Sequence, residues 1–144
     1  KGIPDLKVLT SSLAIASALL AHDQLELVLL GGTVNRGSPD LSGPLTEQNL
    51  ACFRADIAVT GVDAADKKCL YTSSQHIASV SRSMIASAEK TILVADSSKF
   101  GNTSFVKFAG WNDIDLVVVD QGLKTAHRQW LKKSAGELLL APKI

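Results

Sequence analysis

The fold class is decided by the stretch Thr91-Ile92-Leu93-Val94-Ala95-Asp96-Ser97-Ser98-Lys99-Phe100-Gly101. Its first five residues form a short apolar run, which predicts a buried strand. A polar turn follows at residues 96–101, with no helical pattern directly after it. A carboxylate and a lysine with small hydroxyl residues between them are unusual for a plain connection, so we interpret this turn as part of a ligand pocket.

The chain on both sides of this stretch alternates between strand and helix patterns. Further strands are predicted at residues 7–10, 25–30, 56–62 and 115–119, with an edge strand at 138–140. Helices are predicted at residues 13–20, 44–53, 74–88 and 123–133. This alternation indicates an α/β fold with a mostly parallel sheet and helices on both faces. Ligands of such sheets bind beyond the carboxyl ends of the strands.

Polar turns follow four of the predicted strands and form a candidate pocket rim. They are Thr10-Ser11-Ser12, Gly31-Gly32-Thr33, Gly61-Val62-Asp63 and Asp96-Ser97-Ser98-Lys99. Backbone N–H groups at helix N-termini attract phosphate, hydroxyl groups add donors, and a lysine supplies the compensating charge. Asp63 or Asp96 is expected to accept hydrogen bonds from sugar hydroxyls. The plainer alternatives, a helix cap at the serines and an ordinary turn at the glycines, stay open.

Composition favours one domain without an internal boundary, spanning residues 1–144. The chain has 144 residues, of which 46% are hydrophobic, enough to bury a sizeable core. Fifteen Lys and Arg against fourteen Asp and Glu give a net charge of +1, so this segment alone is not expected to bind DNA. The two cysteines form no CxxC motif, which fits a reducing cytoplasm. The apolar runs are too short to cross a membrane.

Motifs of the common enzyme classes are absent from the sequence. There is no GxSxG, HExxH, P-loop or GxGxxG motif, and His22, His76 and His127 stand far apart. We therefore expect neither an enzyme nor a bound cofactor or metal ion. His127 and Trp130 lie on the apolar stripe of the last predicted helix, where packing is the expected use of both.

An ordered set of short motifs resembles the C-terminal sensor domain of DeoR-type bacterial transcriptional repressors. The resemblance covers about residues 8–120, and its most telling part is the run at residues 95–101. The other motifs are Leu9-Thr10-Ser11-Ser12, Leu30-Gly31-Gly32, Leu41-Ser42-Gly43-Pro44, Ala55-Asp56-Ile57-Ala58, Gly61-Val62-Asp63, Arg82-Ser83-Met84-Ile85 and Asp113-Ile114-Asp115.

The resemblance implies a fold related to ribose-5-phosphate isomerase and glucosamine-6-phosphate deaminase. It also implies an effector-binding domain that binds a phosphorylated sugar and controls DNA binding through an N-terminal winged helix-turn-helix. A repressor that reads two half-sites needs at least a dimer, so a homo-oligomer is expected. The family's pocket motifs carry over onto Ser11, Gly31, Gly32, Asp63, Thr72, Asp96 and Lys99.

Two departures from the family pattern qualify these expectations. The winged helix-turn-helix, the first sensor strand and its Gly-Ser/Thr-Thr loop are not in the sequence, so we expect a fragment of a longer protein. Cys69 and Ile77 stand where the family usually has a glycine and an acidic residue. A missing carboxylate changes which hydroxyl groups can be bonded, and the effector is therefore expected to differ from the commoner ones.

Two other functions compete with the sensor hypothesis. The first is a sugar-phosphate isomerase or amino-sugar-phosphate deaminase, with Asp63 or Asp96 as base and Lys99 holding the phosphate. The second is a structural role, in which the domain mediates oligomerisation and its pocket is vestigial.

Overall fold

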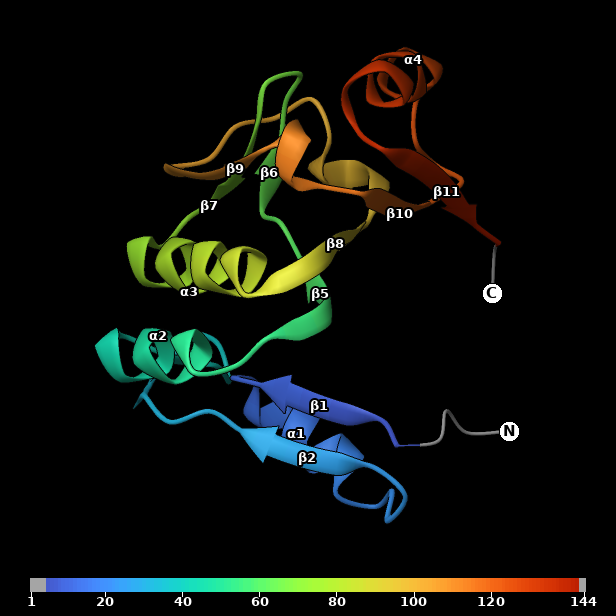
Figure 1. The fold of residues 1–144 in the computed structure, drawn as a ribbon. Coiled ribbons are helices and arrows are strands. Elements are labelled where there is room, and N and C mark those ends of the chain that lie inside the picture. Colours follow the sequence, from blue (N-terminus) through green and yellow to red (C-terminus); the bar gives the residue numbers. More distant parts are fainter. Residues whose placement is uncertain (1–4, 143–144) are drawn as a thin grey trace. The chain divides into compact units, whose positions relative to one another are not determined.

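The computed structural model describes residues 5–142 and divides into two compact units (Figure 1). The first unit runs to Phe53 and the second begins at Arg54. Each unit is described by itself below. The single-domain organisation expected for residues 1–144 stays a prediction.

The first unit is built on a parallel strand–helix–strand motif. Its strands β1 (Lys7–Thr10) and β2 (Glu26–Leu29) pair in parallel, and the helix α1 (Leu13–Leu19) connects them. Two short strands, β3 (Thr33–Val34) and β4 (Leu41–Ser42), then pair antiparallel before the helix α2 (Pro44–Ala51). The elements β1, α1, β2 and α2 follow the predicted order, whereas the short strands β3 and β4 were not predicted.

The ends of the two helices in this unit show how the local sequence is used. Ser12 occupies the N-cap position of α1, but its side chain makes no capping hydrogen bond. Ser12 therefore stands at the expected N-cap position without making the capping hydrogen bond. Pro44 stands in the first turn of α2, where its missing N–H costs no hydrogen bond.

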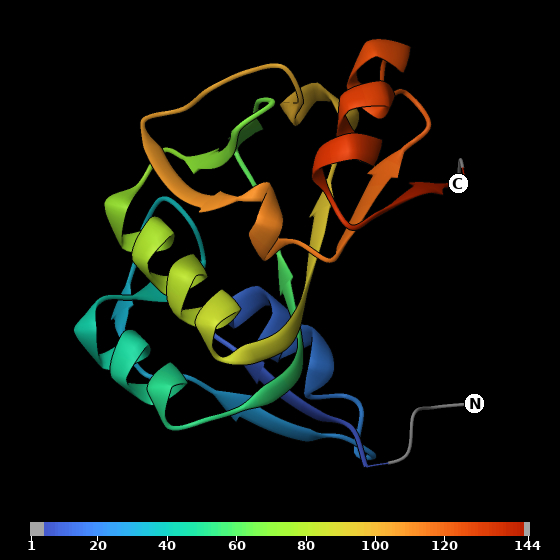
Figure 2. The same cartoon turned by 45° about the horizontal axis from the view of Figure 1, so that its top comes forward.

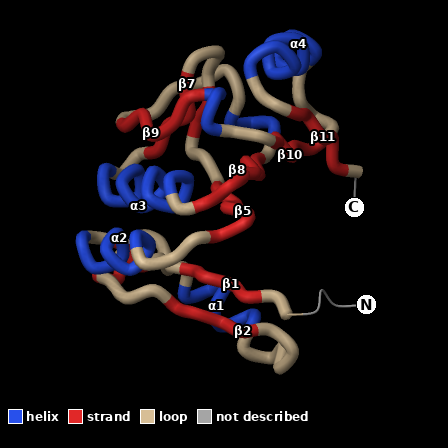
Figure 3. Tube along the Cα trace, in the orientation of Figure 1, coloured by secondary structure: helices blue, strands red, loops and turns tan. Residues whose placement is uncertain are grey.

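The second unit contains a four-stranded, all-parallel sheet in the order β11-β10-β8-β5 (Figure 3). This sheet confirms the predicted α/β class with a mostly parallel sheet. The elements of the unit are β5 (Ala55–Thr60), β6 (Ala64–Ala65), β7 (Cys69–Thr72), α3 (Gln75–Ala86), β8 (Ala88–Ala95), the 3-10 helix η1 (Ser97–Lys99), β9 (Val106–Gly110), the 3-10 helix η2 (Trp111–Asp113), β10 (Leu116–Asp120), α4 (Thr125–Ser134) and β11 (Glu137–Ala141).

The core of the second unit lies on one face of this sheet. Leu93 and Val117 contribute fully buried side chains from the strands, and Ala78 and Leu131 contribute them from α3 and α4. Figure 2 shows α4 beside β11 at the end of the chain. Alternate residues of the same strands point the other way, because side chains alternate along a strand. The opposite face leaves four apolar side chains exposed, namely Ile57, Val59, Val94 and Leu139.

A small antiparallel sheet, β6-β7-β9, completes the second unit and was not predicted. The two residues of β6 are too few to show a periodic pattern, and β7 has a register shift between Leu70 and Tyr71. Leu70 and Ala65 are nevertheless fully buried in the core. The Trp111 indole N–H donates to the backbone oxygen of Asp66 across 2.9 Å, which ties η2 to the β6–β7 turn.

Several predicted boundaries shift by a few residues. The helix predicted to reach Ala88 ends at Ala86, and Ala88 begins β8. The last helix begins at Thr125, while Leu123 is buried in the preceding turn. The turn after β8 forms the 3-10 helix η1, which the sequence pattern did not indicate. Within residues 5–142, no helix has the length and apolar character needed to span a membrane.

Candidate functional site

The carboxyl ends of β5, β8 and β10 bring three aspartates to one edge of the parallel sheet. Asp63 follows β5 by three residues, Asp96 directly follows β8, and Asp120 is the last residue of β10. The polar groups after these strands lie at a common edge because the strands run in parallel. This edge is the candidate site.

Asp63 is held by hydroxyl and backbone donors from the end of β7. Its Oδ2 atom accepts hydrogen bonds from the Thr72 hydroxyl at 3.0 Å, the Ser73 backbone N–H at 2.7 Å and the Ser73 hydroxyl at 2.9 Å. The Asp63 N–H in turn donates to the backbone oxygen of Tyr71. The structure therefore brings together the predicted residues Asp63 and Thr72, and it adds Ser73, which the sequence analysis missed.

The hydrogen bonds around Asp63 keep its carboxyl group ionised. Partial burial raises its pKa, but the donors from Ser73 and Thr72 and the charge of Lys99 lower it, and the net pKa lies below the ordinary value of 3.8. Donors that bond the charged form of a carboxylate favour that form. Asp63 thus presents a fixed negative charge at the sheet edge.

The turn after β8 places Asp96 and Lys99 beside each other. Asp96 caps η1, with its Oδ1 atom accepting the Ser98 N–H at 3.0 Å and the Ser98 hydroxyl as well. The hydroxyl of Ser98, its backbone N–H and the charge of Lys99 lower the pKa of Asp96, although desolvation opposes them. Lys99 Nζ lies 4.0 Å from Asp96 Oδ2, and the Lys99 side chain remains 38% exposed. Lys99 therefore lies beside Asp96, its charge acts on Asp63, and it remains open to solvent.

Asp120 fixes this turn from the neighbouring strand and was also missed. Its Oδ2 atom accepts the Ser97 N–H at 2.5 Å, and its Oδ1 atom accepts the Gly122 N–H at 2.7 Å. These backbone bonds, with that from Ser97 the larger, lower the pKa of Asp120. A carboxylate at the end of an apolar strand is the only signal in the sequence that could have indicated it.

The remaining predicted residues, Ser11, Gly31 and Gly32, lie in the first unit. The Ser11 backbone oxygen accepts the Leu41 N–H at 2.8 Å, which joins the end of β1 to β4. Asn49 and Thr46 of α2 engage the peptide groups of Gly31, whose N–H donates to Asn49 Oδ1 and whose oxygen accepts the Thr46 hydroxyl.

Gly32 has a steric reason to be glycine. Its φ is 153°, and a Cβ atom there would lie 2.1 Å from Thr46 Oγ1. Close packing of the β2 end against α2 thus gives both glycines a structural use. Their role in ligand binding, like that of the other predicted site residues, stays a prediction.

Taken by itself, the site of the second unit offers two kinds of group. Asp63 and Asp96 are fixed acceptors, suited to hydroxyl groups of a polyol, and Lys99 is an accessible cation, suited to an anion. Hydroxyl groups of Thr72 and Ser73 line the same edge. Across residues 5–142, no group of three or more His, Cys, Asp or Glu side chains is placed to hold a metal ion.

Sequence comparison assigns the chain to a family. The profile described as "DeoR C terminal sensor domain" matches residues 1–121. The chain belongs to the DeoR sensor-domain family. This finding confirms the resemblance on which the site residues were chosen. The members similar to this DeoR sensor domain are transcriptional repressors and regulators.

Three relatives illustrate the similarity. The chain is 34% identical over 137 residues to a putative aga operon transcriptional repressor of Escherichia coli O157:H7, which covers 94% of the chain and 51% of the relative. It is 32% identical over 136 residues to the HTH-type transcriptional repressor GlcR of Bacillus subtilis, covering 94% and 53%. It is 36% identical over 128 residues to the HTH-type transcriptional regulator GlpR of Haloferax volcanii, covering 88% and 49%. The chain thus spans about half the length of these relatives.

Proposed function

We propose that this DeoR sensor domain binds a phosphorylated sugar or a related metabolite and thereby controls DNA binding by the protein that contains it. The observation that carries the proposal is the cluster at the sheet edge, in which Lys99 lies 4.0 Å from Asp96 and its charge also acts on Asp63. A lysine is a common phosphate ligand, and fixed carboxylates accept hydrogen bonds from sugar hydroxyl groups. The two recognition elements required by a sugar phosphate therefore occur side by side.

A relative adds support for a phosphorylated ligand. The chain is 26% identical over 117 residues to a protein of Escherichia coli named glycerol-3-phosphate regulon repressor, covering 81% of the chain and 46% of that protein. A polyol phosphate has the same combination of hydroxyl groups and phosphate. DNA contact, in this proposal, is made by a separate winged helix-turn-helix domain, and the repressor acts as a homo-oligomer in the cytoplasm.

The chemistry of the cluster favours sensing over the isomerase or deaminase alternative. A general base for proton abstraction works best with a pKa near the operating pH. The pKa values of Asp63 and Asp96 are instead lowered by the hydrogen bonds that hold these side chains. Both carboxylates are therefore weak bases with fixed hydrogen-bond partners.

Thermal unfolding of the chain against a panel of sugar phosphates tests the proposal. A ligand that binds only the folded state adds roughly 2.7 kcal/mol at about 100 times its dissociation constant, so binding raises Tm. Lys99→Gln should abolish the rise, because it removes the phosphate partner. Lys90→Gln is the matched control, since Lys90 is an exposed lysine near the start of the same strand β8.

Three results would argue against the proposal. A rise in Tm that survives Lys99→Gln would place the ligand elsewhere. Turnover of a sugar phosphate that disappears in Asp63→Asn would support the enzyme alternative. Stable self-association without any sugar-phosphate binding would support the structural role.

A further inference from the structure

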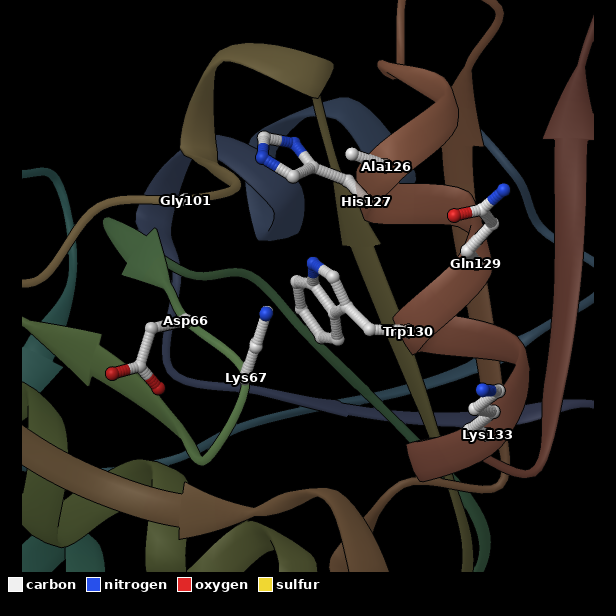
Figure 4. A pocket seen from close by; sticks show the side chains of 8 residues that line it. All are labelled: Asp66, Lys67, Gly101, Ala126, His127, Gln129, Trp130 and Lys133. Atoms are coloured by element: carbon white, nitrogen blue, oxygen red, sulfur yellow. The ribbon is translucent and has the colours of Figure 1, made fainter.

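The second unit contains a pocket that lies apart from every predicted site residue. It has a volume of about 540 Å³ and lies between α4, the β6–β7 turn and the backbone at Gly101 (Figure 4). Pockets for small ligands usually measure roughly 300–1,000 Å³. Neither Lys99 nor the three aspartates of the sheet edge line it. Its size is suited to a small molecule rather than to a single ion.

Hydrogen-bond donors outnumber carboxylates among the polar side chains that line this pocket. Lys67 comes from the β6–β7 turn and Lys133 from α4, and both side chains are exposed. Neither lysine forms an ion pair within residues 5–142. In Figure 4 the Lys67 side chain points toward the indole of Trp130. Trp130 lines the same pocket, and its indole N–H donates no hydrogen bond within the described part of the chain.

The one carboxylate in the lining does not balance these donors. Asp66 Oδ1 accepts the backbone N–H groups of Lys68 and Cys69 at 2.7 and 2.8 Å, and Oδ2 accepts the Tyr71 hydroxyl at 3.0 Å. Figure 4 shows the Asp66 carboxylate turned away from Trp130. The negative charge of Asp66 is thus used to hold its own turn. Two lysines and an indole donor remain for a ligand that carries negative charge.

The wall behind these donors is closely packed. Gly101 has a φ of 85°, and a Cβ atom there would lie 2.8 Å from His127 Nε2, so glycine allows the imidazole to pack against the backbone. The Trp130 ring packs edge-on against Trp111 at a centroid distance of 5.2 Å and against His127 at 6.2 Å. When a pocket is already formed before binding, less free energy is lost in ordering the side chains that contact the ligand.

We propose that this pocket is a second ligand site, distinct from the sheet-edge site, for a small organic anion. Lys67 and the Trp130 indole N–H, which lie next to each other in Figure 4, bind the phosphate or carboxylate group of the anion, and Lys133 adds a second positive charge to the lining. Gly101 is the last residue of the turn at residues 96–101 that carries Lys99, and its N–H donates to Ala65 O at 2.8 Å. An occupied pocket therefore contacts the segment that positions the sheet-edge lysine.

Anion titrations of the full 144-residue chain test this inference. The chain should carry Lys99→Gln, which removes the sheet-edge cation, so that failure of the proposed function does not affect the result. The probes are inorganic phosphate, which represents a phosphate group, and citrate, which represents carboxylate groups. Both are titrated at constant ionic strength. Tryptophan fluorescence reports binding, because Trp130 lines the pocket, and calorimetry provides an independent dissociation constant.

Two pairs of lysine substitutions decide the outcome. Lys67→Gln with Lys133→Gln should weaken binding of at least one probe by about tenfold or more, since two charged partners are lost. Lys68→Gln with Lys132→Gln is the matched pair, because these exposed lysines neighbour the first two but do not line the pocket. The matched pair should leave the dissociation constant within about twofold of its value in the chain that carries Lys99→Gln alone.

Ala126→Glu provides a second, independent test. Ala126 is an exposed residue of α4 that lines the pocket, so a carboxylate there should repel the anion without disturbing the core. Circular dichroism verifies that each variant is folded. Equal weakening by the two lysine pairs, or binding that is unaffected by Ala126→Glu, would overturn the proposal. So would the absence of saturable binding of both probes.

Discussion

The Thr72 hydroxyl donates a hydrogen bond of 3.0 Å to Asp63 Oδ2 and thereby joins the end of β7 to the turn after β5. Thr72 is buried, and Ser73 adds two further donors to the same carboxylate oxygen. The polar edge of the second unit is consequently a bonded network with a defined geometry. Its energetic contribution can be measured by removing single members of the network.

Asp63→Asn is expected to destabilise the chain by about 1 kcal/mol. The amide retains an acceptor oxygen but loses the charge that strengthens the three hydrogen bonds from Thr72 and Ser73. Urea unfolding at neutral pH measures the effect. Asp56→Asn, at an exposed position of β5, is the control and should change the free energy of unfolding by less than about 0.5 kcal/mol. Equal effects of both substitutions would contradict the role assigned to the network.

Stability is expected to fall in acid, because the pKa values of Asp63, Asp66, Asp96 and Asp120 all lie below the ordinary value of 3.8. A carboxyl group with a lowered pKa in the folded state contributes stability above its unfolded pKa, and the contribution is lost as pH falls through the folded pKa. The free energy of unfolding should therefore change little through these groups between about pH 7 and pH 5, and should decline below about pH 4.

Asp66→Asn tests the origin of this acid sensitivity. Hydrogen bonds from Lys68, Cys69 and Tyr71 outweigh the effect of burial on the pKa of Asp66. The variant should have a lower free energy of unfolding than the parent chain near neutral pH. The gap between the two free energies should narrow as pH falls below about 4. Urea unfolding at a series of pH values follows the gap. A gap that is constant down to about pH 2 would exclude a titrating carboxylate as its cause.

Strand–turn units of the fold could be predicted from the sequence where the signal is local. The run that forms β8 and the polar residues after it stand next to each other in the chain, so their pattern indicated both the strand and the site. The sheet β6-β7-β9 could not be predicted in this way, because its pairing joins Cys69 to Gly110 across a long stretch of sequence.

The same distinction between local and long-range signals explains which site residues could be predicted. Asp96 and Lys99 are three residues apart and could be identified together. Asp120 acquires its role only when folding places it against the backbone of Ser97, 23 residues earlier. Likewise, no local pattern shows that Asn49 accepts the hydrogen bond of Gly31, 18 residues before it. Long-range pairing, rather than local propensity, accounts for the residues that sequence analysis missed.

Gly101→Ala is expected to destabilise the chain by about 1–3 kcal/mol for two separable reasons. Its φ of 85° is unfavourable for a side chain, and the new Cβ atom would lie 2.8 Å from His127 Nε2. His127→Ala in the same chain removes the steric part only, so the double variant should lose less stability than the sum of the single losses. Gly61→Ala is the control, since no atom lies within 4 Å of a Cβ atom there.

Leu93→Ala is expected to cost about 2–5 kcal/mol, because a fully buried leucine is replaced by a smaller side chain and leaves a cavity. Leu93 lies in β8 on the core face, between the strands that carry the sheet-edge residues. Val94→Ala, at the next position, changes a side chain that is 48% exposed on the other face and should cost far less. Chemical denaturation of the two variants measures the difference between the faces. Similar losses at both positions would mean that the exposed face is covered in solution, and that its apolar side chains also belong to a packed interface.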